Sequence, residues 1–212
     1  MGLIDFFDDI GDAIFGNKRF NELKHFAKSK DFQIRRKVVA EQLHLDVQAM
    51  HFFEGKKNKR IKGYLYKKDI KFDALTQIFD YYYSSDYGTT TTTIFLYDTS
   101  ALDLPRFIVK PKGGLSKLGN IFTSSEWSTV SRDFDKDFVV ESGDMNYMRM
   151  MITTHFTDVM LRLGDYTIEG KGDFLVIYKK SKKVDIVDMD NIYDDGLELL
   201  DIIINDHSNE LV

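Results

Sequence analysis

Apolar side chains recur at every third or fourth position in four segments of the chain, a spacing that predicts helices. The first segment, residues 1–16, places Leu3, Phe7, Ile10 and Ile14 on one helical face, with aspartates largely opposite. The other three cover residues 18–30, 145–163 and 188–204. For the helix over 145–163, Asp144 is a suitable N-cap and Gly164 a suitable stop.

Aromatic and β-branched residues dominate the segments between these helices and predict strands. The predicted strands cover residues 32–40, 61–66, 75–83, 89–97, 107–109, 138–140, 166–169 and 174–178. Residues 54–60 are predicted as a charged turn, and residues 43–53 are ambiguous between helix and strand. The order of elements favours an α+β fold: an antiparallel sheet of about six to eight strands with helices packed on one face, plus an N-terminal amphipathic helix.

The length of 212 residues suits one domain. We expect residues 1–16 to form the amphipathic helix, residues 17–205 a single α+β domain, and residues 206–212 a frayed tail. No apolar run is long enough to span a bilayer, and the absence of cysteine excludes disulfides and thiolate chemistry. The expected location is the cytoplasm, peripheral to the inner membrane if the first helix docks there.

Charge is distributed unevenly along the chain, whose net charge is −5. Residues 1–72 carry +6, from 16 Lys and Arg against 10 Asp and Glu, and residues 73–212 carry −11. The early segment could pair with the acidic tail or offer a polarised surface to partners, and scattered solvated charge is the preferred interpretation. Eight lysines and arginines between Lys56 and Lys71 surround Tyr64 and Tyr66. That mixture suits single-stranded nucleic acid, but the pI of 5.6 favours a solvated turn over a nucleic-acid partner.

Candidate chemistry is sparse. Gly114 and Gly119 have the glycine spacing of a phosphate-binding loop, but Asn120 replaces its lysine. The histidines have no metal-ligand spacing, and His155 is interpreted as packed at the boundary of the core. The carboxylate pairs Glu141 with Asp144 and Glu169 with Asp173 are interpreted as a helix cap and a turn. The sequence therefore predicts no catalytic residue, no metal site and no cofactor.

Several short segments, in this order along the chain, resemble an uncharacterised bacterial conserved-domain family of unknown function. They include Phe53-Glu-Gly55, Phe79-Asp-Tyr-Tyr-Tyr83, Leu104-Pro-Arg-Phe107 and Ile168-Glu-Gly-Lys-Gly-Asp-Phe-Leu-Val-Ile-Tyr178. Some members of that family are membrane-associated. The resemblance implies a domain with no established activity, and it supplies no catalytic residues.

Two functions follow from these patterns. The favoured one is a non-enzymatic interaction module that docks to an unknown protein partner or a membrane surface through Leu3, Phe7, Ile10 and Ile14. A protein partner is preferred over bare lipid because the aspartates repel anionic headgroups. The alternative is a small-molecule-binding domain or an enzyme, with a pocket near the weakly patterned 112–135 loop that carries Trp127, the only tryptophan.

Overall fold

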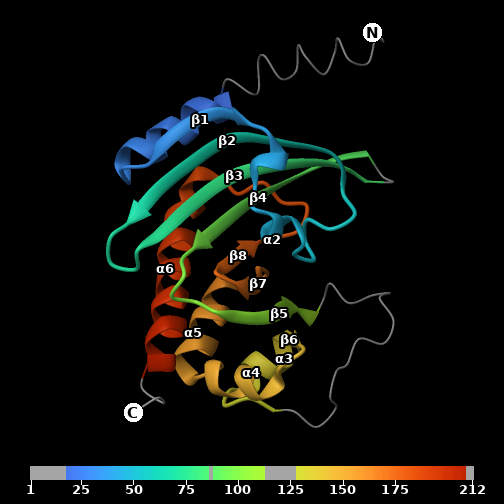
Figure 1. The fold of residues 1–212 in the computed structure, drawn as a ribbon, viewed down its shortest axis with the longest axis vertical. Coiled ribbons are helices and arrows are strands. Elements are labelled where there is room, and N and C mark those ends of the chain that lie inside the picture. The colour runs from blue at the N-terminus through green and yellow to red at the C-terminus, as the bar shows by residue number, and fades with distance from the viewer. Residues whose placement is uncertain (1–17, 86–87, 113–127, 209–212) are drawn as a thin grey trace.

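A computed structural model describes residues 18–85, 88–112 and 128–208 of the chain. Its centre is one antiparallel sheet of eight strands in the order β1-β2-β3-β4-β8-β7-β5-β6 (Figure 1). The strands are β1 Gln33–Val38, β2 Lys57–Asp69, β3 Ala74–Ser85, β4 Gly88–Asp98, β5 Leu104–Pro111, β6 Phe138–Ser142, β7 Thr167–Gly172 and β8 Phe174–Tyr178. The predicted α+β class and the antiparallel sheet are confirmed.

Helices cover one face of this sheet along most of its length. They are the described part of helix α1 (residues 18–29), α4 Met145–Met151, α5 Thr154–Leu163 and α6 Ile186–Ser208, with the short α3 Arg132–Asp137 beside α5. Their apolar residues and one set of alternate strand residues form the main core, which includes Phe26, Phe95 and Phe156. Within the described ranges, no helix combines the length and hydrophobicity required to cross a bilayer.

The opposite face carries a second, smaller core. The 3-10 helix η1 Ala40–Gln42, helix α2 Leu45–Gln48 and the turn that follows them pack on β2, β3, β4 and β8. Phe52, Phe53 and Tyr81 meet there with ring centroids 5.0–5.9 Å apart. Because the central strands are buried on both faces, β3 reads as a nearly continuous apolar and aromatic run. The segment 43–53, ambiguous in sequence, is the cover of this second core.

The predicted helix over 145–163 is two helices, and this expectation is corrected. The chain turns at Ile152 (φ −84°, ψ 76°), and Thr153 then caps α5 by accepting a hydrogen bond from Phe156 N. The predicted ends hold, since Asp144 caps α4 and Gly164 ends α5 with φ +64°. The periodicity hides the break because Ile152 and Phe156 are both buried, four positions apart, on either side of it.

The predicted charged turn over 54–60 is also corrected, because β2 already begins at Lys57. Lys57 and Arg60 pair with Ser84 and Tyr82 of β3. Strand β1 pairs only with residues 61–66 of β2, so residues 57–60 continue the edge of the sheet beyond β1. Lysine and arginine on this edge are therefore strand residues.

Candidate functional site

A groove lies where four strands begin or end. Strands β5 and β8 finish, and β6 and β7 start, at the same end of the sheet, as the pairs Pro111–Phe138 and Thr167–Tyr178 show. The groove has a volume of about 750 Å³, within the range typical of small-molecule sites. Its walls include His51 and the end of α5 at Leu161 and Gly164. Lys112 and Lys136, at either end of the predicted 112–135 loop, also line the groove, and a pocket formed by that loop stays a prediction because residues 113–127 lie outside the described residues.

Five lysines line this groove, which we call the lysine groove: Lys110, Lys112, Lys136, Lys179 and Lys180. Two of them pair with carboxylates, Lys110 with Glu141 at 2.6 Å and Lys179 with Asp165 at 2.8 Å. The Lys112 ammonium donates to the backbone carbonyl of Asp135. The side chains of Lys136 and Lys180 make no ion pair or hydrogen bond with any described residue. The groove therefore holds cationic groups free to receive an anion.

Lysine crowding also affects a neighbouring group. Burial and the positive charge of Lys180 lower the pKa of Lys56 to about 8. The Lys56 ammonium lies 4.3 Å from the Phe52 ring centroid and 4.7 Å from that of Tyr83, where the ring faces attract it. Burial, the larger cause, and the charge of Lys180 both disfavour the protonated form of Lys56.

Apolar side chains share the groove with the lysines: Ile108, Pro111, Phe138 and Leu161. Tyr178 also lines it, but its hydroxyl points to a buried carboxylate and donates to Glu169 Oε1 at 2.5 Å. The lining combines five lysines and the carboxylates of Asp137 and Asp165 with apolar surface. Such a lining suits an amphiphilic anion better than a small inorganic one.

Glu169, interpreted from the sequence as a turn residue, lies within β7 and is only 2% exposed. It accepts hydrogen bonds from Tyr178 and from Phe52 N, the latter at 3.3 Å. Burial raises its pKa, and these hydrogen bonds and His51 oppose that rise. Because its carboxylate fastens the β7–β8 hairpin to the turn after α2, we assign it a structural role. No sequence signal distinguished it from an exposed hairpin glutamate.

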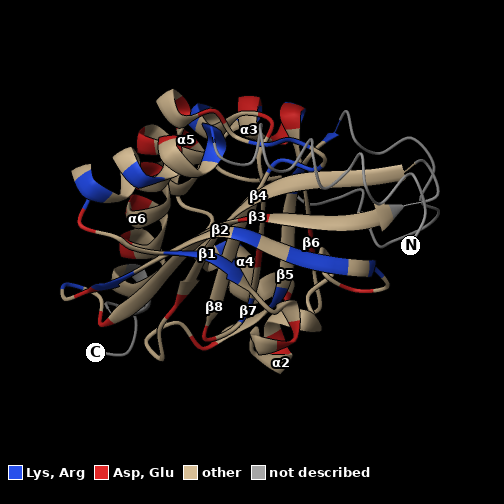
Figure 2. Ribbon diagram, turned by 90° about the horizontal axis from the view of Figure 1, so that it is seen from above, with Lys and Arg blue, Asp and Glu red and all other residues tan. Residues whose placement is uncertain are grey.

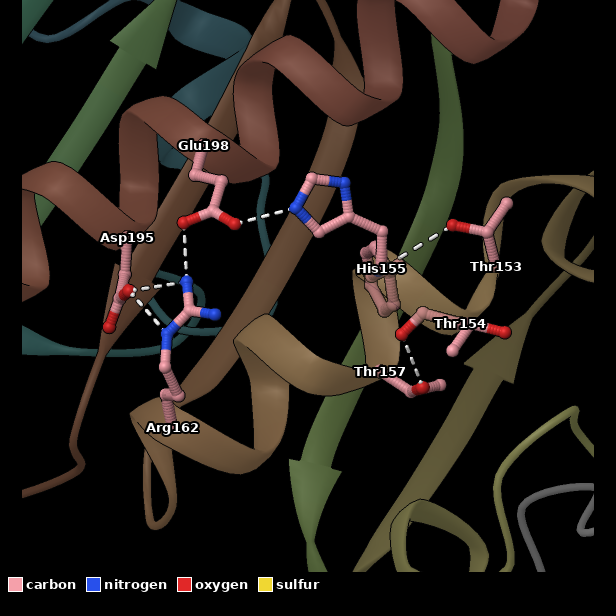
Figure 3. A network of polar contacts seen from close by, with 8 residues as sticks. Thr153, Thr154, His155, Thr157, Arg162, Asp195 and Glu198 are labelled. Carbon is pink, nitrogen blue, oxygen red and sulfur yellow. Dashed lines mark hydrogen bonds and ion pairs between the residues drawn. The ribbon is translucent and has the colours of Figure 1, made fainter.

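A second polar cluster joins α5 and α6 on the outer surface (Figure 3). His155 Nε2 lies 2.6 Å from Glu198 Oε1, and Arg162 pairs with both Glu198 and Asp195. His155 is exposed, which corrects its expected place at the core boundary. The nearby threonines cap or hydrogen-bond the start of α5, as Thr153 and Thr157 do. The cluster fastens two helices, and among the described residues no hydroxyl group is hydrogen-bonded to His155.

The structure does not test the other residues that the sequence predicts to bind a partner or ligand. Leu3, Phe7, Ile10, Ile14 and Trp127 lie outside the described residues, so their binding roles stay predictions. Among the described residues, no group of three or more histidines or carboxylates is arranged to hold a metal ion. The lysines of the groove were missed because their positions in the sequence share no spacing.

The fold and the groove define a class: an antiparallel-sheet α+β domain with a lysine-rich, partly apolar groove. No protein-family model and no curated protein matches the chain. Among solved structures, the chain is similar to the crystal structure of the mycobacterial trehalose monomycolate transport factor A, TtfA. The TM-score is 0.58 at 12% identity, and the match covers 88% of this chain and 93% of that chain. At this identity the likeness shows a shared fold.

Proposed function

We propose that this protein is a non-enzymatic binding module that holds an amphiphile with an anionic headgroup in the lysine groove. The observation that carries the proposal is the pair Lys136 and Lys180, two cations without a described partner at the rim of a groove that also offers apolar surface. Charge-assisted hydrogen bonds from such lysines suit a phosphate or carboxylate. The apolar side chains suit an acyl chain.

The shared fold supports a role in handling lipids. TtfA is named as a transport factor for trehalose monomycolate, and a groove for amphiphiles is chemistry that such a factor could use. The described lining of the groove pairs no nucleophile with a base, which favours binding over catalysis. A cytoplasmic location beside a membrane stays a prediction.

The test is equilibrium binding of a single-chain anionic lipid, lysophosphatidic acid, kept below its micellar concentration. Glycerol phosphate and inorganic phosphate test the headgroup alone, and monoacylglycerol tests the chain alone. We expect lysophosphatidic acid to bind at least ten-fold more tightly than any of these, because only it engages lysines and apolar residues together. Monoacylglycerol binding equally well would overturn the anionic headgroup.

The matched variants separate the groove from general charge. Lys136→Glu with Lys180→Glu should weaken lysophosphatidic acid binding by at least ten-fold. Lys28→Glu with Arg149→Glu makes the same change in net charge at exposed positions outside the groove and should leave binding unchanged. Equal binding by both double variants would show that the lysine groove is not the site.

A further inference from the structure

The free edge of the sheet at β1 and the start of β2 is strongly basic (Figure 2). We call Arg35, Lys37, Lys57, Lys59 and Arg60 the basic edge. Lys37, Lys57, Lys59 and Arg60 form no ion pair or side-chain hydrogen bond with any residue the structure describes, and Arg35 stacks on Tyr66 at 5.1 Å. Their charges are therefore available to a partner.

Protection of an edge strand explains part of this charge, since cations on an exposed edge discourage pairing with another sheet. It does not explain the hollow beside it. Lys37, Lys59 and Arg60 border a shallow groove of about 430 Å³ whose acidic member is Glu41. Val39 also lines this groove, with 58% of its surface exposed. Cations around an exposed apolar side chain are complementary to a lipid bilayer, whose anionic headgroups lie above apolar acyl chains.

We propose that the basic edge docks this protein onto an anionic lipid bilayer. The five cations match in number the lysine and arginine clusters by which amphipathic helices recognise anionic lipids, and each contributes about a five-fold increase in binding near such a surface. The strands of the basic edge and those of the lysine groove lie at opposite ends of the strand order. Lys56 lies between the two regions, because its pKa, lowered mainly by burial, is lowered further by both Lys180 and Lys59. The basic edge would bring the protein to the membrane that holds its ligand.

Single-stranded nucleic acid is disfavoured by the state of the nearby aromatic rings. Sequence-tolerant binding of single strands needs ring faces open for base stacking. Here Arg35 covers Tyr66, Lys62 covers Tyr82 at 4.7 Å, and Arg36 and Lys24 cover Phe20. The Tyr64 hydroxyl donates a hydrogen bond to Gln77, and the Tyr66 hydroxyl donates one to Gln33. The edge thus offers charge without a stacking platform.

The experiment is flotation of the full chain with vesicles of phosphatidylcholine, alone or with about 30% phosphatidylglycerol. We expect binding to the anionic vesicles only, with loss of binding as salt shortens the Debye length. The triple variant Lys57→Glu, Lys59→Glu, Arg60→Glu should bind at least ten-fold more weakly. The control variant Lys28→Glu, Arg132→Glu, Arg149→Glu makes the same change in net charge and should bind as the unmodified protein does.

Two outcomes would overturn the proposal. Equal losses in both triple variants would mean that net charge, rather than the basic edge, governs binding. A labelled oligonucleotide that binds while vesicles do not would assign the edge to nucleic acid. Circular dichroism of both variants shows that each is folded. Lysophosphatidic acid binding by the Lys57, Lys59 and Arg60 variant separates the two proposals. Because these three residues do not line the lysine groove, the variant should lose vesicle binding to a far greater extent than lysophosphatidic acid binding.

Discussion

Glu169 shows how one buried side chain can set a pH dependence. Its pKa is raised from 4.5, mainly because burial disfavours the charged form. The native state therefore keeps a proton that the unfolded chain has already released, so the stability associated with this group is present at low pH and is lost as pH rises through the folded pKa. Tyr178, Phe52 and His51 limit this effect by favouring the carboxylate.

We predict that Glu169→Gln reduces this loss, because the glutamine stays neutral and still accepts a hydrogen bond from Tyr178. The variant should gain stability relative to the unmodified protein as pH rises above about 4.5. Urea denaturation across that range measures it. Glu54→Gln, at an exposed position on the adjacent turn, is the control and should parallel the unmodified protein. Parallel curves for Glu169→Gln would contradict the assignment.

At the scale of elements, one buried ion pair holds helix α1 on the sheet. The Arg19 guanidinium donates to both Asp80 oxygens at 2.9 and 3.1 Å, and Thr93 donates to Asp80 at 2.6 Å. Thr93 in turn accepts from Val184 N at 3.0 Å, just before α6. The network therefore joins α1, β3, β4 and the approach to α6.

We predict that Arg19→Met costs about 3–5 kcal/mol of unfolding free energy, because it leaves Asp80 charged and buried without its partner. Adding Asp80→Asn should recover part of that loss, since the amide can still accept from Thr93 and carries no charge. Chemical denaturation of the two singles and the double gives the coupling free energy. A double variant less stable than Arg19→Met alone would show that the pair is not acting as an ion pair.

The sequence predicts those elements whose pattern lies in neighbouring residues. It does not predict features that depend on residues far apart in the chain. The sequence predicts the strands at 75–83 and 89–97, which are β3 and β4, because both are runs of β-branched and aromatic residues. Gly196, inside α6, has no local explanation: a Cβ there would lie 2.0 Å from the Tyr97 hydroxyl, so the glycine admits a residue 99 positions away in sequence. The lysine groove is equally non-local, because its lysines meet only when β8 and β7 insert between β4 and β5.

Across the whole molecule, the basic early segment and the acidic late segment are partly joined. Lys30 lies 3.5 Å from both Asp190 and Asp194, and Lys71 lies 3.0 Å from Asp201 of α6. Two early lysines therefore pair with the acidic final helix. The basic edge lies outside these pairs. A chain of net charge −5 therefore retains a local surface of the opposite sign.

The N-terminal segment then provides a whole-molecule prediction. Residues 1–17 contain four aspartates and no lysine or arginine, and the described contacts of α1 with the sheet begin at Arg19. Deleting residues 1–17 should change the unfolding free energy by less than about 1 kcal/mol. It should also strengthen binding to anionic vesicles. The deletion removes four negative charges, which repel the anionic surface, from a protein that docks through the basic edge.

Denaturation and flotation of the truncated and full chains measure both effects, and sedimentation with salt-washed native membranes adds a third. A collapse in stability would assign residues 1–17 to the core. Weaker vesicle binding by the truncated chain would show that the N-terminal segment itself binds the lipid bilayer. Loss of sedimentation with native membranes while vesicle binding persists would support the predicted docking of Leu3, Phe7, Ile10 and Ile14 to a membrane protein. The charge of the segment favours that last result, because its aspartates suit a protein groove better than an anionic lipid surface.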